Sequence, residues 1–163
     1  MTKTNTTAPE KLKIALVKAR EDQIEKLVTG SIIMRNDMFL LVKRVADDDM
    51  FGGLWEIPSG GVDAGETFVE GLVREQKEET GTDVLEVVEY VNSLDYLSGS
   101  GKKARQLNCI VRVDIHQPIT LEPEEHNQYT WVSPKTDIRA EYSCSEGMYV
   151  MLEEIQRYLL NIS

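Results

Sequence analysis

The segment 60–82, GGVDAGETFVEGLVREQKEETGT, constrains the fold of this chain more than any other part of the sequence. It predicts a helix that directly follows a glycine-rich turn. Thr67 with Glu70 three residues later forms a capping-box pattern, and Gly81 stands where a left-handed residue ends a helix. The apolar stripe of this helix consists of Val69, Leu72 and Val73. The segment therefore predicts a loop-helix-loop unit whose helix packs against a core by one face.

Three carboxylates on this helix indicate chemistry. Glu75, Glu78 and Glu79 stand at positions i, i+3 and i+4, which lie on adjacent parts of one helical face. Like charges at this spacing destabilise a helix unless a cation lies among them. Glu75 and Glu79 flank the apolar stripe, and Glu78 points further from it. Because carboxylate oxygens suit Mg²⁺ or Mn²⁺, and Mg²⁺ commonly accompanies phosphates, the segment predicts metal-assisted chemistry on a phosphorylated substrate.

Length and composition limit the remaining possibilities. The 163 residues suffice for one domain with a core, and a 41% hydrophobic content is ordinary for a globular protein. No apolar run is long enough to span a membrane, and the start MTKTNTTAPEK lacks the apolar region of a secretory signal. We therefore expect a cytoplasmic protein with a loose polar tail over residues 1–9 and no membrane partner.

The formal net charge of −10 argues against binding a nucleic acid polymer, because such a chain repels the phosphate backbone. A nucleotide substrate remains compatible with this charge, since a divalent cation can lie between protein carboxylates and phosphates. Two cysteines, Cys109 and Cys144, do not make a disulfide framework. We expect Cys109 to be a buried thiol in a strand.

The rest of the chain predicts an α/β or α+β fold in which strands dominate the middle. Residues 27–34 and 38–45 read as a hairpin with its turn at Asn36 and Asp37, whereas 12–28 fits either strand or helix. Strands are predicted over 84–97, 104–115 and 128–132. The inward face of the second consists of Leu107, Cys109, Val111, Val113 and Ile115. A last helix over about 144–160 has a capping box at Ser143 and Glu146. Its apolar positions are Met148, Met151, Leu152, Ile155 and Leu159.

The segment 60–82 resembles the signature of the Nudix hydrolases, the MutT-like family. That signature is Gly, five residues, Glu, seven residues, then Arg-Glu-aliphatic-x-Glu-Glu-x-Gly-aliphatic. The matching residues are Gly60, Glu66, Arg74, Glu75, Glu78, Glu79 and Gly81. Two aliphatic positions differ, because they hold Gln76 and Thr82. These departures affect packing rather than chemistry, since a buried amide needs hydrogen-bond partners.

The resemblance implies one Nudix domain over residues 10–163, an αβα sandwich around a mixed sheet. It implies hydrolysis of a nucleoside diphosphate linked to a group X. Metal ligands would be Glu75, Glu78, Glu79 and the carbonyl of Gly60, with Glu75 and Glu78 also counted as catalytic. Glu66 and Arg74 would orient them. The expected cofactor is Mg²⁺ or Mn²⁺. A homodimer is a further possibility, because dimers are common among similar proteins.

The general base and the substrate are less constrained. In similar enzymes a glutamate from a later loop accepts the proton of the attacking water, and of Glu124 and Glu125 we favour Glu125. Arg44 and Phe51 are candidates for contacting a phosphate and a base. A nucleoside triphosphate pyrophosphohydrolase is favoured, since the region 96–100 carries no proline marker of ADP-ribose enzymes. A nucleotide-sugar pyrophosphatase, a non-catalytic nucleotide sensor and a cysteine-dependent prenyl diphosphate isomerase are the alternatives.

Overall fold

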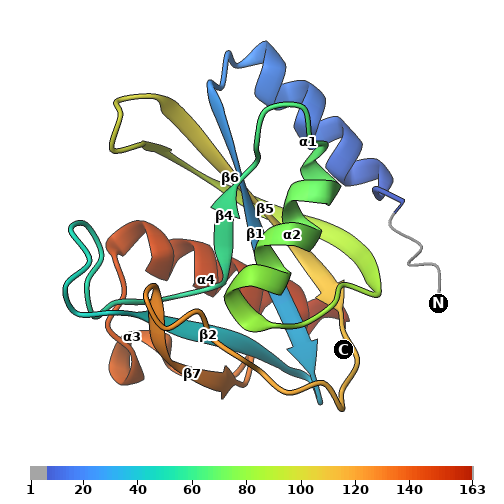
Figure 1. Ribbon diagram of the computed structural model, residues 1–163. Helices are drawn as coiled ribbons and strands as arrows, with labels where there is room; N and C mark the ends of the chain where they lie inside the picture. The colour runs from blue at the N-terminus through green and yellow to red at the C-terminus, as the bar shows by residue number, and fades with distance from the viewer. Residues whose placement is uncertain (1–6, 163) are drawn as a thin grey trace.

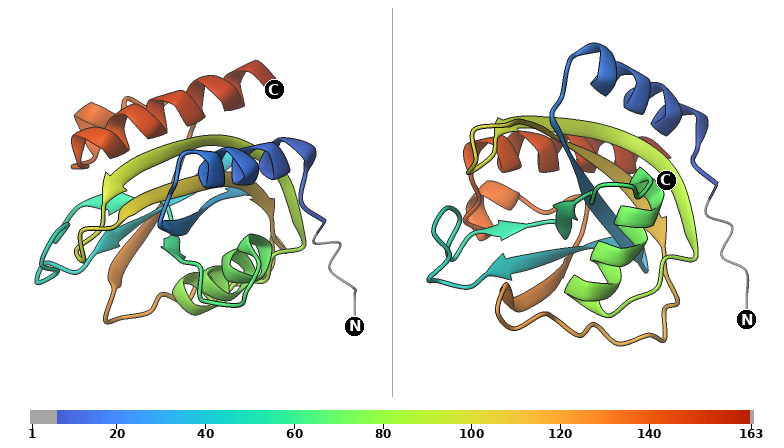
Figure 2. Two further views of the ribbon diagram at one scale, coloured as in Figure 1. Left: turned by 90° about the horizontal axis from the view of Figure 1, so that it is seen from above. Right: turned by 45° about the horizontal axis from the view of Figure 1, so that its top comes forward.

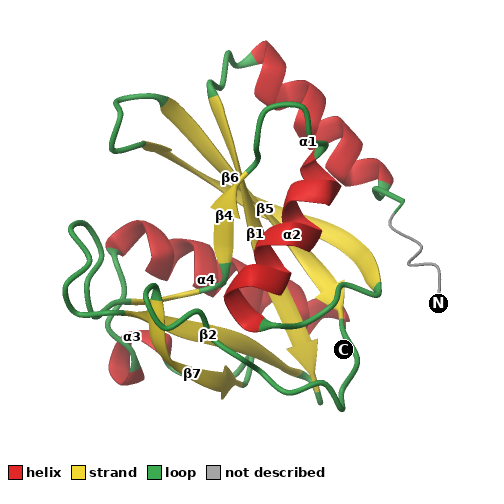
Figure 3. Ribbon diagram, in the orientation of Figure 1, coloured by secondary structure: helices red, strands yellow, loops and turns green. Residues whose placement is uncertain are grey.

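The computed structural model describes residues 7–162, so most of the predicted tail 1–9 lies outside the described residues. Within them the chain forms four helices and seven strands (Figures 1 and 3). Their order is α1 (Glu10–Glu21), β1 (Lys26–Arg35), β2 (Met38–Arg44), β3 (Trp55–Glu56), β4 (Ser59–Gly61), α2 (Phe68–Thr80), β5 (Glu86–Leu97), β6 (Lys103–Arg112), β7 (His126–Val132), α3 (Ile138–Glu141) and α4 (Glu146–Ile162). No helix among the described residues is both long and apolar enough to cross a membrane.

The ambiguous segment 12–28 divides into helix α1 and the start of β1. Leu12 and Ala19 are buried at positions that share one helical face, whereas Ile14 and Val17 face solvent. This periodicity is helical, and an alternating strand would have buried Ile14 together with Leu12. The helix ends before Gln23, which has a φ of 57°.

The strands form one mixed sheet centred on β1. On one edge β1 pairs with β6 in parallel, and on the other it pairs with β4 and with the start of β2, both antiparallel. β6 continues to β5, and β2 continues to β3 and β7. The predicted hairpin is confirmed: Asn36 and Asp37 form its turn with φ values of 51° and 62°, as a two-residue I′ turn requires.

Helices cover both faces of the sheet, as expected for an αβα sandwich (Figure 2). Helices α1 and α2 pack on one face, where Leu12, Phe68 and Leu72 join the first buried cluster. On the other face α3 and α4 close a second cluster, which contains Met151 and Leu152. The α2 carboxylates therefore lie on one side of the sheet and α4 on the other.

Two predicted details were wrong. Strand β6 ends at Arg112, so Ile115 lies beyond the sheet and is exposed, whereas the other four residues of that face are buried. Helix α4 begins at Glu146, and Ser145 caps it by accepting a hydrogen bond from Met148 N at 3.3 Å. Ser143 instead belongs to the preceding loop, where its carbonyl accepts from Trp55 N. The five apolar α4 positions are buried as predicted.

Helix α2 has the ends that its sequence predicts. Thr67 accepts a hydrogen bond from Glu70 N at 3.1 Å, and Gly81 follows the helix with a φ of 71°. The two residues that depart from the family signature compensate each other, because buried Gln76 Nε2 donates to buried Thr82 Oγ1 at 3.1 Å. Gln76 Oε1 has no partner among the described residues. The packing expected to be disturbed at these two positions is therefore replaced by a local polar contact.

Candidate active site

Arg74 holds the loop before α2 against the helix. Its guanidinium donates to both carboxylate oxygens of Glu66, at 2.6 and 3.1 Å, and to the carbonyl of Gly61 at 2.9 Å. Glu66 also accepts from Asp63 N, and these bonds, led by those of Arg74, lower the pKa of Glu66 to about 2. The two residues predicted to orient the site thus join the glycine-rich loop to the helix.

Arg74 also contacts two of the three helix glutamates. Its Nη1 lies 2.8 Å from Glu75 Oε1 and 3.3 Å from Glu78 Oε2. The guanidinium therefore balances part of the negative charge that the carboxylates bring together. Glu78 is the outermost of the three, with 58% of its side chain exposed, in line with its predicted direction.

Glu79 is the deepest of the three carboxylates. It is buried, and its Oε2 accepts a hydrogen bond from Ser59 N at 3.0 Å. Next to Ser59, a side chain at Gly60 would place its Cβ 2.1 Å from Glu75 Oε2. Only a glycine lets the backbone of β4 come this close to the helix carboxylates. The structure thus brings Gly60, Glu75 and Glu79 together, as the sequence predicts.

A loop far along the chain completes the negative surface. Thr120 N donates to the carbonyl of Thr80 at 2.8 Å, and Glu122 N to that of Glu79 at 3.3 Å. These two bonds tie the loop before β7 to the end of α2, so that carboxylates of the loop and the helix line one cavity of about 230 Å³. We call it the acidic cavity. Its lining residues are Glu75, Glu78, Glu79, Glu122, Glu124 and Glu125.

Charge and burial in this cavity favour protonation. Burial, followed by the neighbouring charges of Glu56, Glu125 and Glu75, raises the pKa of Glu79 to about 9. Burial also raises the pKa of Glu75, although Arg74 opposes this shift. A cation in the cavity would relieve the same repulsion.

The donor set fits a hard divalent cation, because six carboxylates converge on one small cavity beside the backbone of Gly60. As the side chains stand, no three acidic, histidine or cysteine side chains in residues 7–162 are close enough to hold an ion. Glu75 and Glu78 instead form ion pairs with Arg74. Binding an ion would require these carboxylates to exchange that contact for the metal.

A partly buried chain of ion pairs lies next to the cavity, where Glu56 is close enough to Glu79 for their charges to interact. Glu56 Oε1 lies 2.9 Å from His126 Nε2 and 2.9 Å from Arg44 Nε, and Arg44 Nη1 reaches Asp48 at 3.0 Å. His126 is buried, which indicates a structural role, and it directly follows Glu125 in the sequence. Val45 N also donates to the carbonyl of Glu125. The contacts of His126 and Val45 hold the backbone beside Glu125 in place.

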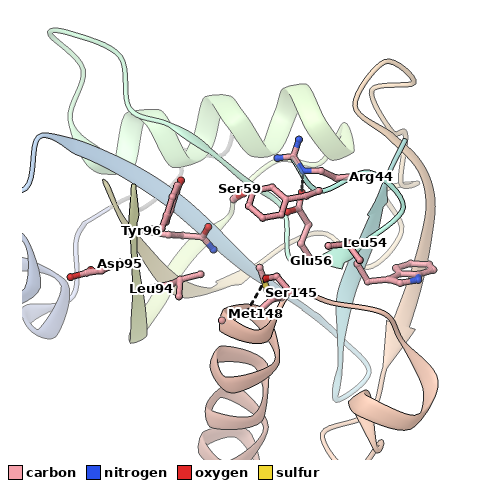
Figure 4. Close-up of a pocket in the computed structure, with 13 residues that line it drawn as sticks. Arg44, Leu54, Glu56, Ser59, Leu94, Asp95, Tyr96, Ser145 and Met148 are labelled. Carbon is pink, nitrogen blue, oxygen red and sulfur yellow. Dashed lines mark hydrogen bonds and ion pairs between the residues drawn. The ribbon is translucent and has the colours of Figure 1, made fainter. Parts of the chain in front are cut away.

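A second cavity, of about 270 Å³, lies next to the first. Figure 4 shows the residues that line it. We call it the apolar pocket. Its lining residues are Arg44, Phe51, Leu54, Trp55, Glu56, Ser59, Leu94, Asp95, Tyr96, Gln106, Ser145, Gly147 and Met148. Ser59 links the two cavities, because it lines the pocket while its backbone N–H donates a hydrogen bond to Glu79, which lines the acidic cavity. The predicted pair Arg44 and Phe51 both line this pocket, with the guanidinium 6.0 Å from the Phe51 ring centroid.

The sequence pattern did not identify several of these residues. Glu122 belongs to the same acidic run as Glu124 and Glu125, so the run itself was an available signal. Glu56 was also available, as a carboxylate between two apolar residues of a strand. Gln106 and Tyr96 had no local signal, because they reach the pocket only through the pairing of β5 with β6.

Comparison with known proteins gives the same family as the signature. The family model described as the NUDIX domain matches residues 25–141. The nucleoside triphosphatase NudI of Escherichia coli K12 is 29% identical over 119 residues, which cover 68% of this chain and 84% of NudI. Among solved structures, the E. coli ORF135 protein is 30% identical with a TM-score of 0.66, over 83% of this chain and 92% of that one.

An ADP-ribose pyrophosphatase from Streptococcus suis is 23% identical, with a TM-score of 0.60 over 82% of this chain and 90% of that one. At this identity the likeness concerns the fold alone. The family model, in contrast, covers most of the chain and includes the whole of the signature segment. The protein therefore belongs to the Nudix family and is a Nudix hydrolase.

Proposed function

We propose that this Nudix hydrolase is a divalent-cation-dependent nucleoside triphosphate pyrophosphohydrolase, which releases a nucleoside monophosphate and pyrophosphate. The observation that carries the proposal is the position of the acidic cavity directly beside the apolar pocket, with Ser59 between them. The pocket is slightly smaller than sites for drug-sized ligands, so it suits a nucleobase better than a whole nucleotide. The phosphates of a bound nucleotide would then extend toward the glutamates.

The positions of the residues support the roles proposed for them. Glu75, Glu78 and Glu79 would hold Mg²⁺ or Mn²⁺ together with the Gly60 carbonyl, while Glu66 and Arg74 keep the loop and helix in register. When bound, the ion would neutralise the phosphates and lower the pKa of a water molecule. Glu125 is exposed on the opposite wall of the cavity and would accept the proton of that water.

Arg44 would contact the phosphates from the pocket side. Its guanidinium is only 25% exposed and is shared between Asp48 and Glu56. It lies near Glu79 closely enough for the two charges to interact. Phe51 borders the same pocket and offers an apolar ring to the base.

The alternatives fit the site less well. NudI is called a nucleoside triphosphatase, which supports the triphosphate over a nucleotide sugar. All three helix glutamates are present, which favours catalysis over a sensing role. An isomerase mechanism would need a reactive thiolate. Burial raises the pKa of Cys109 to about 12 and that of Cys144 to about 11, so neither thiol ionises at neutral pH.

A substrate panel tests the proposal. Purified protein is incubated with the common ribo- and deoxynucleoside triphosphates, ADP-ribose and a dinucleoside tetraphosphate, each with Mg²⁺, with Mn²⁺ or with EDTA. We expect at least one triphosphate to give a monophosphate and pyrophosphate, with kcat/KM above that of ADP-ribose and no turnover in EDTA. A clear preference for ADP-ribose, or release of inorganic phosphate from the triphosphate, would refute the proposal.

A further inference from the structure

The apolar pocket contains one buried amide with an unused acceptor. Gln106 on β6 is only 4% exposed, yet its side chain lines the pocket. Its Nε2 donates to Asn108 Oδ1 at 2.8 Å, away from the pocket, because Asn108 does not line it. Among the described residues, no hydrogen bond reaches Gln106 Oε1. Unlike Gln76 Oε1, this oxygen is not fully enclosed by protein, so it can accept a hydrogen bond from a ligand or water in the pocket.

A chain of amides decides which atom of Gln106 faces the pocket. At its far end Asn92 Nδ2 donates to the carbonyl of Met151 at 3.1 Å and to Glu154 Oε2 at 3.0 Å. Both partners accept only, so the Asn92 amide cannot be turned round. Its Oδ1 therefore accepts from Asn108 Nδ2, at 2.9 Å. Asn108 Oδ1 is then left to accept from Gln106 Nε2, and Gln106 Oε1 is the atom that remains for the pocket.

The neighbouring strand leaves room for this arrangement. Gly30 on β1 pairs directly with Asn108, and a Cβ at Gly30 would lie 2.0 Å from Asn108 Oδ1 and 2.9 Å from Gln106 Nε2. Met151 on α4 closes the other side, with its sulfur 2.8 Å from Asn108 Nδ2. The two amides are therefore enclosed by β1 and α4, and the direction of the chain is set by packing as well as by hydrogen bonds.

We propose that Gln106 contributes to base recognition by presenting a hydrogen-bond acceptor, so that the pocket favours a nucleobase that turns an N–H group toward it over a base that has no donor there. This inference rests on the proposed function, since it assigns the base of the nucleotide to the apolar pocket. The two carboxylates of the pocket agree with it, whereas the hydroxyls of Ser59, Tyr96 and Ser145 can either donate or accept. Glu56 and Asp95, which also line the pocket, are acceptors when ionised, and the Arg44 guanidinium already contacts Glu56 and Asp48.

The test compares bases that differ in their N–H donors. The substrates dATP and dGTP are measured against the triphosphate of deoxynebularine, and dCTP and dTTP against that of deoxyzebularine. Both analogues lack every N–H on the base. For the best natural substrate we expect kcat/KM at least about 10-fold above that of its analogue, because the analogue leaves Gln106 Oε1 without a partner.

Two variants test whether the ratio of kcat/KM between natural substrate and analogue depends on Gln106. Gln106→Met removes the acceptor at similar volume and is expected to bring the ratio close to one by lowering activity on the natural substrate. Asn92→Ala lies outside the pocket and removes the anchor of the amide chain, so the Gln106 amide can turn and the ratio should fall with little change in the rate on the analogue. This second effect is one that a general loss of stability would not produce.

The outcomes separate the two proposals. If the wild type hydrolyses natural and analogue triphosphates within about twofold, or if Gln106→Met keeps the wild-type ratio, the inference about Gln106 is wrong and the proposed function stands. If the wild type hydrolyses no triphosphate in the panel, the proposed function is wrong and the inference falls with it.

Discussion

The acidic cavity and the apolar pocket adjoin each other but are built in opposite ways. Three of the six carboxylates of the cavity come from one turn of α2, and the other three from one short loop before β7. The pocket takes its lining from strands β2 to β6, the loop after β2 and the start of α4. The residues proposed to carry out hydrolysis are thus close together in the sequence, whereas the residues proposed to surround the rest of the substrate come from distant segments.

The largest effect should come from the deepest carboxylate of the cavity. Glu79→Gln keeps the shape and the hydrogen bond from Ser59 N but removes a proposed metal ligand. We expect kcat/KM to fall about 1,000-fold, since a bound ion supplies several kcal/mol of transition-state stabilisation. Thermal unfolding should show no loss of stability, because a buried carboxylate among like charges is removed. Glu70→Gln, at an exposed position of the same helix, is the control and should stay active.

A smaller effect should separate two neighbours in the loop. Glu125→Gln is expected to lower kcat by about 100-fold, the usual range for loss of a general base, with little change in KM. Glu124→Gln changes the adjacent exposed carboxylate of the same cavity and should cost less than about fivefold. If the two variants lose kcat equally, Glu125 is not the general base, and Glu124 and Glu125 contribute only negative charge to the cavity.

Arg74→Lys tests whether orientation of the cavity matters separately from its ligands. Lysine keeps the charge but cannot bind Glu66 through two nitrogens, as Arg74 does. We expect about a 10-fold loss of kcat/KM and a higher Mg²⁺ requirement, in the range seen when groups that orient metal ligands are altered. Arg139→Lys is the matched control, because Arg139 also binds two glutamates, Glu146 and Glu153, but far from the cavity. An unchanged Mg²⁺ requirement in Arg74→Lys would contradict the orienting role.

The smallest effect should appear in stability alone. Thr82→Val leaves Gln76 Nε2 without its partner and removes the 2.7 Å contact between the Thr80 and Thr82 hydroxyls, although Thr80 keeps its bond to the Gln76 carbonyl; the free energy of unfolding should fall by about 1–3 kcal/mol. Adding Gln76→Leu restores an apolar pair and also removes the unpaired Oε1, so the double variant should recover most of the loss. Urea unfolding of the two single variants and the double variant measures this coupling. Additive losses would mean that the two residues do not compensate each other, and hydrolysis should be normal in all three.

Much of the fold could be predicted because its signals are local. The turn at Asn36 and Asp37, the caps of α2 and the apolar spacing of α4 each depend on residues a few positions apart. The segment 12–28 was ambiguous because Leu12, Ile14 and Leu16 also alternate like a strand, and only burial by the sheet decides the face. Ile115 continued the alternation of β6 beyond the last residue that the sheet pairs.

The site shows the same difference between features with a local sequence signal and features that depend on tertiary contacts. The approach of Glu125 to α2 could be anticipated only from the resemblance, since no local pattern contains the bonds of Thr120 and Glu122 to the helix carbonyls. The role proposed for Gln106 could not be anticipated at all. The orientation of its amide depends on Asn92 and Asn108, which lie on two strands, and on the Met151 carbonyl of α4. The residues proposed to carry the reaction could be predicted from their spacing in the sequence, whereas the residue proposed to recognise the base could be found only from the tertiary structure.

We propose that the acidic cavity carries out hydrolysis while the apolar pocket recognises the base. One measurement tests it most directly: kcat/KM of the wild type, Glu79→Gln and Gln106→Met across the same set of natural and donor-lacking triphosphates. We predict that Glu79→Gln lowers every value by a similar factor and preserves the order of substrates, and that Gln106→Met changes the order. A changed order in Glu79→Gln, or wild-type activity in that variant, would contradict the account.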